Sequence, residues 1–147
     1  MQETLNNIEP TCPDLSLDFT IKIPPSVNHM YIQTKGGSKI LTKDAKEYIK
    51  HTQNVVKKKM REIGYSVEEP GVWHYMDLYF YFPDKRIRDS HNCIKILMDS
   101  LEGLLFMNDY YIMPRIQDVQ LDRDNPRLEV IYKPKGEADG KKPRYQS

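Results

Sequence analysis

Strict alternation of apolar and polar positions marks several stretches of the chain, and this is the two-residue period of a β-strand. Every second residue of 15–23 is apolar, and a Pro-Pro pair ends the run. Residues 73–82 are rich in aromatic side chains and predict a central strand whose even-numbered residues, from His74 to Phe82, face the core. Short strand patterns at 30–34 and 38–41 surround a Gly-Gly pair and predict a hairpin. Two further strands are expected at 111–121 and 127–132.

Two other stretches repeat their apolar positions every three or four residues, which predicts amphipathic helices. The first begins after Thr42, a suitable N-cap, and ends at Gly64. The second begins at Asp89 or Ser90, either of which could cap it, and its apolar stripe continues to Leu105. Strands and helices in this order predict a single α+β domain, with two main helices on a mixed sheet.

The chain has 147 residues, enough for one domain with a core. Charged residues make up 29% and apolar residues 39%, and both ends of the chain are polar. We therefore expect a flexible leader at 1–14, a domain at 15–133 and a flexible basic tail at 134–147. No stretch resembles a signal peptide or a membrane span, so we expect no membrane association. The two cysteines, far apart, predict neither a disulfide nor a zinc site, which fits a cytoplasmic setting.

The net charge is only +1, so any binding of nucleic acid must depend on where the charges lie. The outer face of the first helix carries a cluster of basic residues: Lys43, Lys46, Lys50, Lys57, Lys58 and Arg61. This cluster could be an ordinary solvated face, or it could contact phosphates. We single out Lys57 and Lys58 as candidate DNA contacts.

Residues 84–109 combine a charged run with the second helix. Four polar side chains lie at its start: Asp89, His91, Asn92 and Lys95. The positive end of the helix dipole favours an anion such as a phosphate at this point. Asp89 and Asp109 could supply the oxygen ligands that magnesium prefers. A helix rises about 1.5 Å per residue, so Asp109 would have to return along a strand beside Asp89.

Each of these residues also has a structural explanation. Asp89 could be only the helix cap, and Asp109 only a loop acid before a strand. Lys95 could be the i,i+4 partner of Asp99, a role compatible with catalysis.

Three segments between Ile23 and about Tyr132 form a specific combination. They are PPSVNH at 24–29 followed by Tyr31, PDKR at 83–86 leading to R-D-x-x-N-x-x-K-x-x-x-D-x-L at 88–101, and Asn108-Asp109 before a strand. This combination resembles the RusA-type Holliday-junction resolvases, small endodeoxyribonucleases of phage and prophage. The resemblance implies an α+β homodimer that binds branched DNA at four-way junctions. It also implies that magnesium, or manganese, assists two symmetrical cuts, with no small-molecule cofactor.

By position, Asp89 and Asp109 resemble the family's first and last metal-binding aspartates, and Lys95 resembles its catalytically required lysine. The resemblance thus implies metal-assisted hydrolysis of a phosphodiester in which Lys95 stabilises developing charge. The side chains that we expect to contact DNA are Arg86, Arg88, Lys85, Asn92, Asn28, Lys57 and Lys58.

The chain departs from the family pattern in two places. Where that pattern reads Asp-x-Asp-Asn, this chain has His91 before Asn92, and where it reads Asp-Asp, this chain has Asn108 before Asp109. His91 could bind the metal and favour manganese, could help deprotonate the attacking water, or could have neither role.

Three hypotheses follow. We favour an active junction-cutting nuclease with His91 in its site, because the supporting Arg, Asn, Lys and Asp99 positions are all present. The alternative is a module that binds junctions with weak or no cleavage. A third is a structural or regulatory protein whose basic tail contacts another partner.

Overall fold

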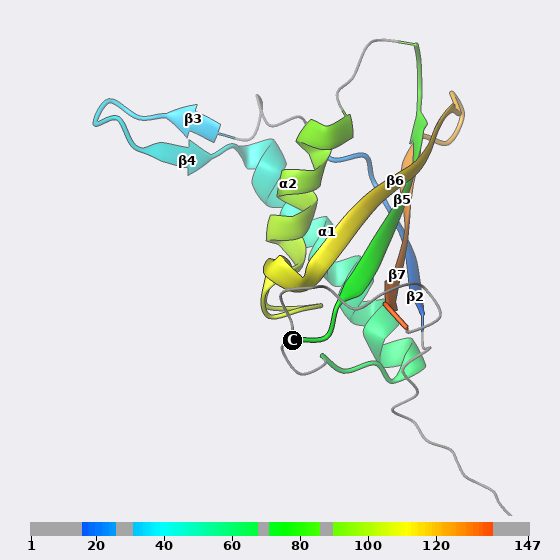
Figure 1. Ribbon diagram of the computed structural model, residues 1–147. Helices are drawn as coiled ribbons and strands as arrows, with labels where there is room; N and C mark the ends of the chain where they lie inside the picture. Colours follow the sequence, from blue (N-terminus) through cyan, green and yellow to red (C-terminus); the bar gives the residue numbers. More distant parts are fainter. Residues whose placement is uncertain (1–15, 26–30, 68–70, 86–89, 137–147) are drawn as a thin grey trace, which may run out of the picture.

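The structure is a computed structural model that describes residues 16–25, 31–67, 71–85 and 90–136 (Figure 1). Its elements in chain order are β2 (Leu17–Ile21), β3 (Tyr31–Gln33), β4 (Lys39–Leu41), α1 (Lys43–Ile63), β5 (His74–Phe82), α2 (Ser90–Leu101), the 3-10 helix η2 (Asp109–Tyr111), β6 (Ile112–Leu121) and β7 (Arg127–Pro134). The expected leader and residues 137–147 of the expected tail lie outside the described residues. Among the described helices, none is long and apolar enough to cross a membrane.

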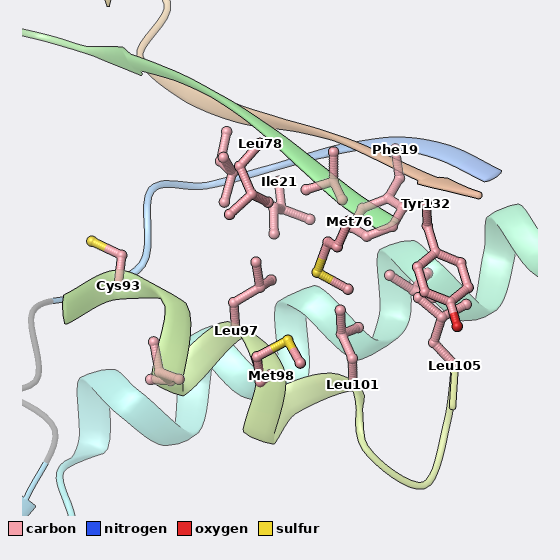
Figure 2. Packing of buried hydrophobic residues seen from close by; sticks show 14 of the residues in the cluster. Phe19, Ile21, Met76, Leu78, Cys93, Leu97, Met98, Leu101, Leu105 and Tyr132 are labelled. Atoms are coloured by element: carbon pink, nitrogen blue, oxygen red, sulfur yellow. The ribbon is translucent and has the colours of Figure 1, made fainter. Parts of the chain in front are cut away.

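Four strands form one mixed sheet in the order β2-β7-β5-β6, and β3 and β4 form a separate two-stranded sheet. β5 pairs in parallel with β6, which requires the chain to cross back over the sheet, and α2 makes that crossover. The pairs β2–β7 and β5–β7 are antiparallel. Both helices cover one face of the four-stranded sheet (Figure 1 and Figure 2). The predicted α+β fold is therefore confirmed.

The core lies between the helices and the sheet face that they cover. In β2 the apolar residues are buried and the intervening polar residues are exposed, as the alternation predicts. On β5 the even-numbered set from His74 to Phe82 is buried, and Figure 2 shows Met76 and Leu78 pointing toward the helices. Asp77, on the opposite face of β5, is buried too. The open face of the sheet therefore also contains a buried charged side chain.

The limits of α1 agree with the local signals in the sequence. The Thr42 hydroxyl accepts a hydrogen bond from the backbone N–H of Ala45 at 3.1 Å, which satisfies one of the free donors at the helix start. Gly64 ends the helix with φ of 70°, in the left-handed region that favours glycine. Both predicted ends are confirmed.

Helix α2 is shorter than its apolar stripe predicts. The stripe continues to Leu105, but the helix ends at Leu101. Gly103 has φ of 87°, and its N–H donates to the carbonyl of Phe106 at 2.7 Å, so the chain turns instead of continuing the helix. Leu105 is still buried in the core, because this turn returns it to the packed side of the helix.

The last strand extends slightly beyond its predicted end. β7 runs to Pro134, and the next N–H, that of Lys135, donates to the carbonyl of Trp73 at 2.8 Å. The contact between this segment and β5 therefore continues to Pro134 and Lys135, the first two residues of the expected basic tail.

Candidate active site

The outer face of α2 carries a lysine next to a carboxylate. Lys95 and Asp99 are one helical turn apart, and the Lys95 Nζ atom lies 3.4 Å from the Asp99 Oδ2 atom. Both residues are exposed. An exposed pair of this kind adds little stability, but it directs the Lys95 ammonium group toward the Asp99 carboxylate on the outer face of α2. The structure thus brings together the two residues that the sequence paired.

Asp109 lies in an exposed turn near the C-terminal end of α2. The Asn108 side chain accepts a hydrogen bond from the N–H of Tyr110 at 2.9 Å and caps the 3-10 helix η2. The Asp109 N–H donates to the Glu102 carboxylate at 3.4 Å. Because Glu102 directly follows Leu101, the last residue of α2, this contact fixes Asp109 at the C-terminal end of that helix.

The sheet topology explains why Asp109 lies there. In the parallel pairing of β5 with β6, His74 is opposite Ile112 and Phe82 is opposite Leu121. Asp109 precedes β6 and therefore lies at the edge of the sheet where β5 begins. Helix α2 starts after β5 has ended, and its 12 residues span about 18 Å. Ser90 and Asp109 are consequently at opposite ends of α2 within one copy of the chain (Figure 1).

Several candidate residues lie outside the described part of the chain. These are Asn28, Arg86, Arg88 and Asp89. His91 and Asn92 belong to the first turn of α2, for which the structure describes the backbone. The exposed lysines at 57, 58 and 85 are described: Lys57 and Lys58 lie on α1, and Lys85 follows β5. The last turns of α1 thus present two cations to solvent, which agrees with both interpretations of this face.

Among the described residues, the carboxylates at the C-terminal end of α2 could serve as metal ligands. Asp109 and Glu102 are both exposed and offer hard oxygen atoms, the donor type that magnesium binds. Within the described ranges, no group of three or more His, Cys, Asp or Glu side chains is placed to hold a metal. The donor type of these two carboxylates therefore fits a divalent metal.

Among the polar contacts that were not anticipated from the sequence, two bear on the surroundings of Asp109. Glu102 beside Asp109 is one. The other is on the open face of the sheet, where Asp77 accepts hydrogen bonds from Arg115 at 2.6 and 2.9 Å and from Gln117 at 3.1 Å. The only local signal for this second contact is Asp77 itself, an acidic residue within an aromatic strand. The partners of Asp77 lie on β6, far along the chain, so no local pattern indicates them.

The electrostatics of Asp77 follow from these contacts. Burial disfavours its charged form, but the hydrogen bonds from Arg115 and Gln117 and the positive charge of Arg115 outweigh burial, so the pKa of Asp77 is held below its usual value. The Arg115 guanidinium also lies over the Tyr75 ring, 3.6 Å from its centroid. This network joins β5 to β6 and stabilises the strand that follows Asp109.

A family model described as Endodeoxyribonuclease RusA matches residues 21–132. The match begins at the last residue of β2 and ends within β7, so it includes both helices and the surroundings of Lys95 and Asp109. This places the chain among enzymes that cut DNA internally. Because the match covers well over half of the 147 residues, the chain belongs to the RusA endodeoxyribonuclease family. No curated protein sequence matches the chain.

Proposed function

We propose that this protein is a metal-dependent, structure-selective endodeoxyribonuclease that resolves four-way DNA junctions by paired symmetrical nicks. The observation that carries the proposal is the family match over the segment that holds the exposed Lys95 and Asp109. Magnesium is the proposed cofactor, and manganese is a possible substitute. Its proposed ligands are Asp89, Asp109 and His91, and carboxylate oxygens are the donors that magnesium prefers.

We infer that a site with these ligands draws on two copies of the chain. Ligands of one metal ion must lie within a few ångströms of each other, because each is about 2.1 Å from a magnesium ion. Asp109 lies beside Glu102, and the 12 residues of α2 place the start of the helix about 18 Å away. We therefore propose that Asp109 of one protomer completes the site that Asp89 and His91 begin on the other. A two-fold homodimer would then hold two equivalent sites, one for each strand to be cut.

The side chains have distinct proposed roles. Asp89, Asp109 and His91 would hold the metal ion, which would supply the chemistry that activates a water molecule and offsets negative charge at the phosphorus. Lys95 supplies positive charge to the phosphate oxygens as the bond breaks, and Asp99 holds its ammonium group at 3.4 Å. His91 either binds the metal or accepts the proton of the attacking water. The proposed contacts with the DNA backbone are Arg86, Arg88, Lys85, Asn92, Asn28, Lys57 and Lys58.

One observation favours a second candidate, a junction-binding protein with weak or no cleavage. Asn108 occupies the position where the family pattern has an additional acid, and its side chain is engaged in capping η2. The site therefore has less negative charge with which to bind a metal. The distinction between the two candidates depends on cleavage, since both would bind a junction.

A synthetic four-way junction distinguishes the two candidates. We expect paired nicks in magnesium or manganese, and their loss in Asp89→Asn. Asp124→Asn, which alters an exposed acid in the turn between β6 and β7, is the matched control and should cut normally. Junctions that are shifted in a gel but stay intact in both metals would contradict the nuclease and support the binding module. The salt concentration must be constant, because contacts with phosphates weaken strongly as salt rises.

A further inference from the structure

The β3–β4 hairpin stands apart from the rest of the fold. Figure 1 shows it projecting beyond the start of α1, away from the four-stranded sheet. Its two strands pair with each other, with Ile32 opposite Ile40 and Gln33 opposite Lys39. Leu41, at the base of the hairpin, is partly buried and packs against the core. The hairpin is thus anchored at its base, and its outer part is presented to solvent.

The turn of this hairpin has a defined geometry. The N–H of Thr34 donates to the carbonyl of Ser38 at 2.7 Å, and the N–H of Gly37 donates to the carbonyl of Thr34 at 3.0 Å. Gly37 has φ of 85°, a value that glycine adopts without strain. Turns with a left-handed glycine at this point match the twist of the two strands. The hairpin can therefore present its side chains in a fixed arrangement.

An apolar pair, Ile32 and Ile40, lies exposed on this projection. The two residues are direct cross-strand partners, so their side chains share one face of the hairpin. Ile32 is 53% exposed and Ile40 is 49% exposed. A two-stranded hairpin is only marginally stable in water. The cross-strand contact of the two β-branched side chains supports the pairing, but about half of each side chain remains exposed to water. The apolar pair therefore indicates a surface that becomes covered on binding.

The charge of the hairpin indicates what covers it. Residues 31–41 contain Lys35 and Lys39 and no acidic residue, and both lysines are exposed. An apolar surface beside cations complements nucleic acid whose base faces are uncovered next to phosphates. In a continuous duplex the base faces are covered by stacking. At the branch point of a four-way junction this stacking is most easily broken, so base faces can be uncovered there beside closely spaced phosphates.

We propose that the β3–β4 hairpin is a wedge that enters the branch point of a four-way junction. Ile32 and Ile40 cover unstacked base faces, as inserted apolar side chains do in proteins that kink DNA. Lys35 and Lys39 contact the flanking phosphates. This inference rests on the proposed function and adds to it the element that distinguishes a junction from a duplex.

The test uses a synthetic junction with 2-aminopurine, a base whose fluorescence rises when it is unstacked, placed at the branch point. Binding is measured without divalent metal, for this junction and for a duplex of the same sequence at the same salt concentration. The variant is Ile32→Thr/Ile40→Thr, which keeps the β-branched shape that strands favour. The control is Val119→Thr/Leu121→Thr, an apolar pair of similar exposure, 49% and 51%, on the edge strand β6.

We expect the wild-type protein to raise the fluorescence on binding, and the hairpin variant to lose most of that rise. Its affinity for the junction should fall about tenfold, while its affinity for the duplex changes less than about twofold. The control should behave as the wild type does. Three results would each overturn the wedge: a fluorescence rise equal to the wild-type value, an equal loss of affinity for junction and duplex, or a loss of self-association in sedimentation, which would make the hairpin a protein contact.

The wild-type measurements separate this inference from the proposed function. If the wild-type protein cuts the junction in metal but does not raise the fluorescence, the wedge is wrong and the nuclease stands, with no variant needed. If the wild-type protein has no preference for the junction over the duplex and cuts neither, the proposed function fails and the wedge fails with it. A thermal melt of each variant, followed by circular dichroism, verifies that the fold is retained.

Discussion

Replacing Asp77 with asparagine removes the charged acceptor of the network on the open face of the sheet. Asp77 is 4% exposed and receives two hydrogen bonds from Arg115 and one from Gln117. The asparagine has almost the same shape, so it leaves no cavity. It has one oxygen where the aspartate has two, and its amide group directs N–H donors at the Arg115 guanidinium. The change therefore tests the polar network alone.

The expected magnitude follows from the burial of the two partners. Removing one partner of a fully buried ion pair costs about 3–5 kcal/mol. The side chain of Arg115 is 39% exposed, so water can solvate its guanidinium once the carboxylate is gone. Its contact with the Tyr75 ring is also retained. We therefore expect Asp77→Asn to lower the free energy of unfolding by about 2 kcal/mol, near the value for hydrogen bonds to charged groups.

Urea denaturation of the two proteins measures this difference directly. A shift in midpoint at an unchanged slope reports a change in stability. Asp124→Asn is the control, and a surface change of this kind should stay within about 0.5 kcal/mol of the wild type. A loss below about 0.5 kcal/mol for Asp77→Asn would refute the reasoning, because the buried network would then contribute nothing.

The dependence of stability on pH provides a second readout of the same residue. The pKa of Asp77 is lower in the folded protein than in the unfolded chain, so the folded state favours its charged form. Its contribution is therefore complete above the unfolded pKa of about 3.9 and is lost as the pH falls through the folded value. We expect the difference between wild type and Asp77→Asn to be constant at neutral pH and to shrink below about pH 4. If the difference in unfolding free energy between the two proteins instead grew as the pH fell, it would contradict a lowered pKa for Asp77.

Two further substitutions test the site and the core. Lys95→Gln should slow junction cleavage in single-turnover assays about 100-fold or more while junction affinity in a gel shift changes little, because the proposed role of the lysine is to stabilise charge that develops during bond breaking. A normal cleavage rate would contradict that role. Leu101→Ala should lower the free energy of unfolding in urea by about 3 kcal/mol, since Leu101 is fully buried where α2 ends. Leu121→Ala, at an exposed position, should cost less than about 0.5 kcal/mol, and similar losses for the two would contradict the description of the core.

Local signals in the sequence account for the parts of the fold that were predicted. Thr42 and Gly64 set the ends of α1 through their own backbone and side-chain preferences, so both ends could be predicted. The apolar stripe of α2 could not give its end, because Leu105 is buried whether it lies in the helix or after the turn at Gly103. Periodicity reports which residues are buried, and several backbone paths can bury the same residues.

The arrangement of the candidate site depended on contacts between distant parts of the chain. The sequence identified Lys95 and Asp99 as neighbours because their spacing is one helical turn. It left open whether Asp109 returns beside Asp89, since that depends on how β6 pairs with β5. The parallel pairing of the two strands places Asp109 at the other end of α2. The same holds for Asp77, whose partner Arg115 is on a different strand and has no local relation to it.

A complementation experiment tests the central claim, that this nuclease builds its metal site from two protomers. Asp89→Asn and Asp109→Asn proteins, each of which we expect to be inactive alone, are mixed, allowed to exchange subunits, and incubated with a four-way junction in magnesium. In a mixed dimer one site receives both substituted residues and the other receives both native aspartates. We therefore expect the mixture to recover nicking of one strand per junction, at roughly a quarter of the wild-type activity, since about half of the dimers are mixed and each has one intact site. A mixture as inactive as its components, although subunit exchange is demonstrated, would contradict the shared site.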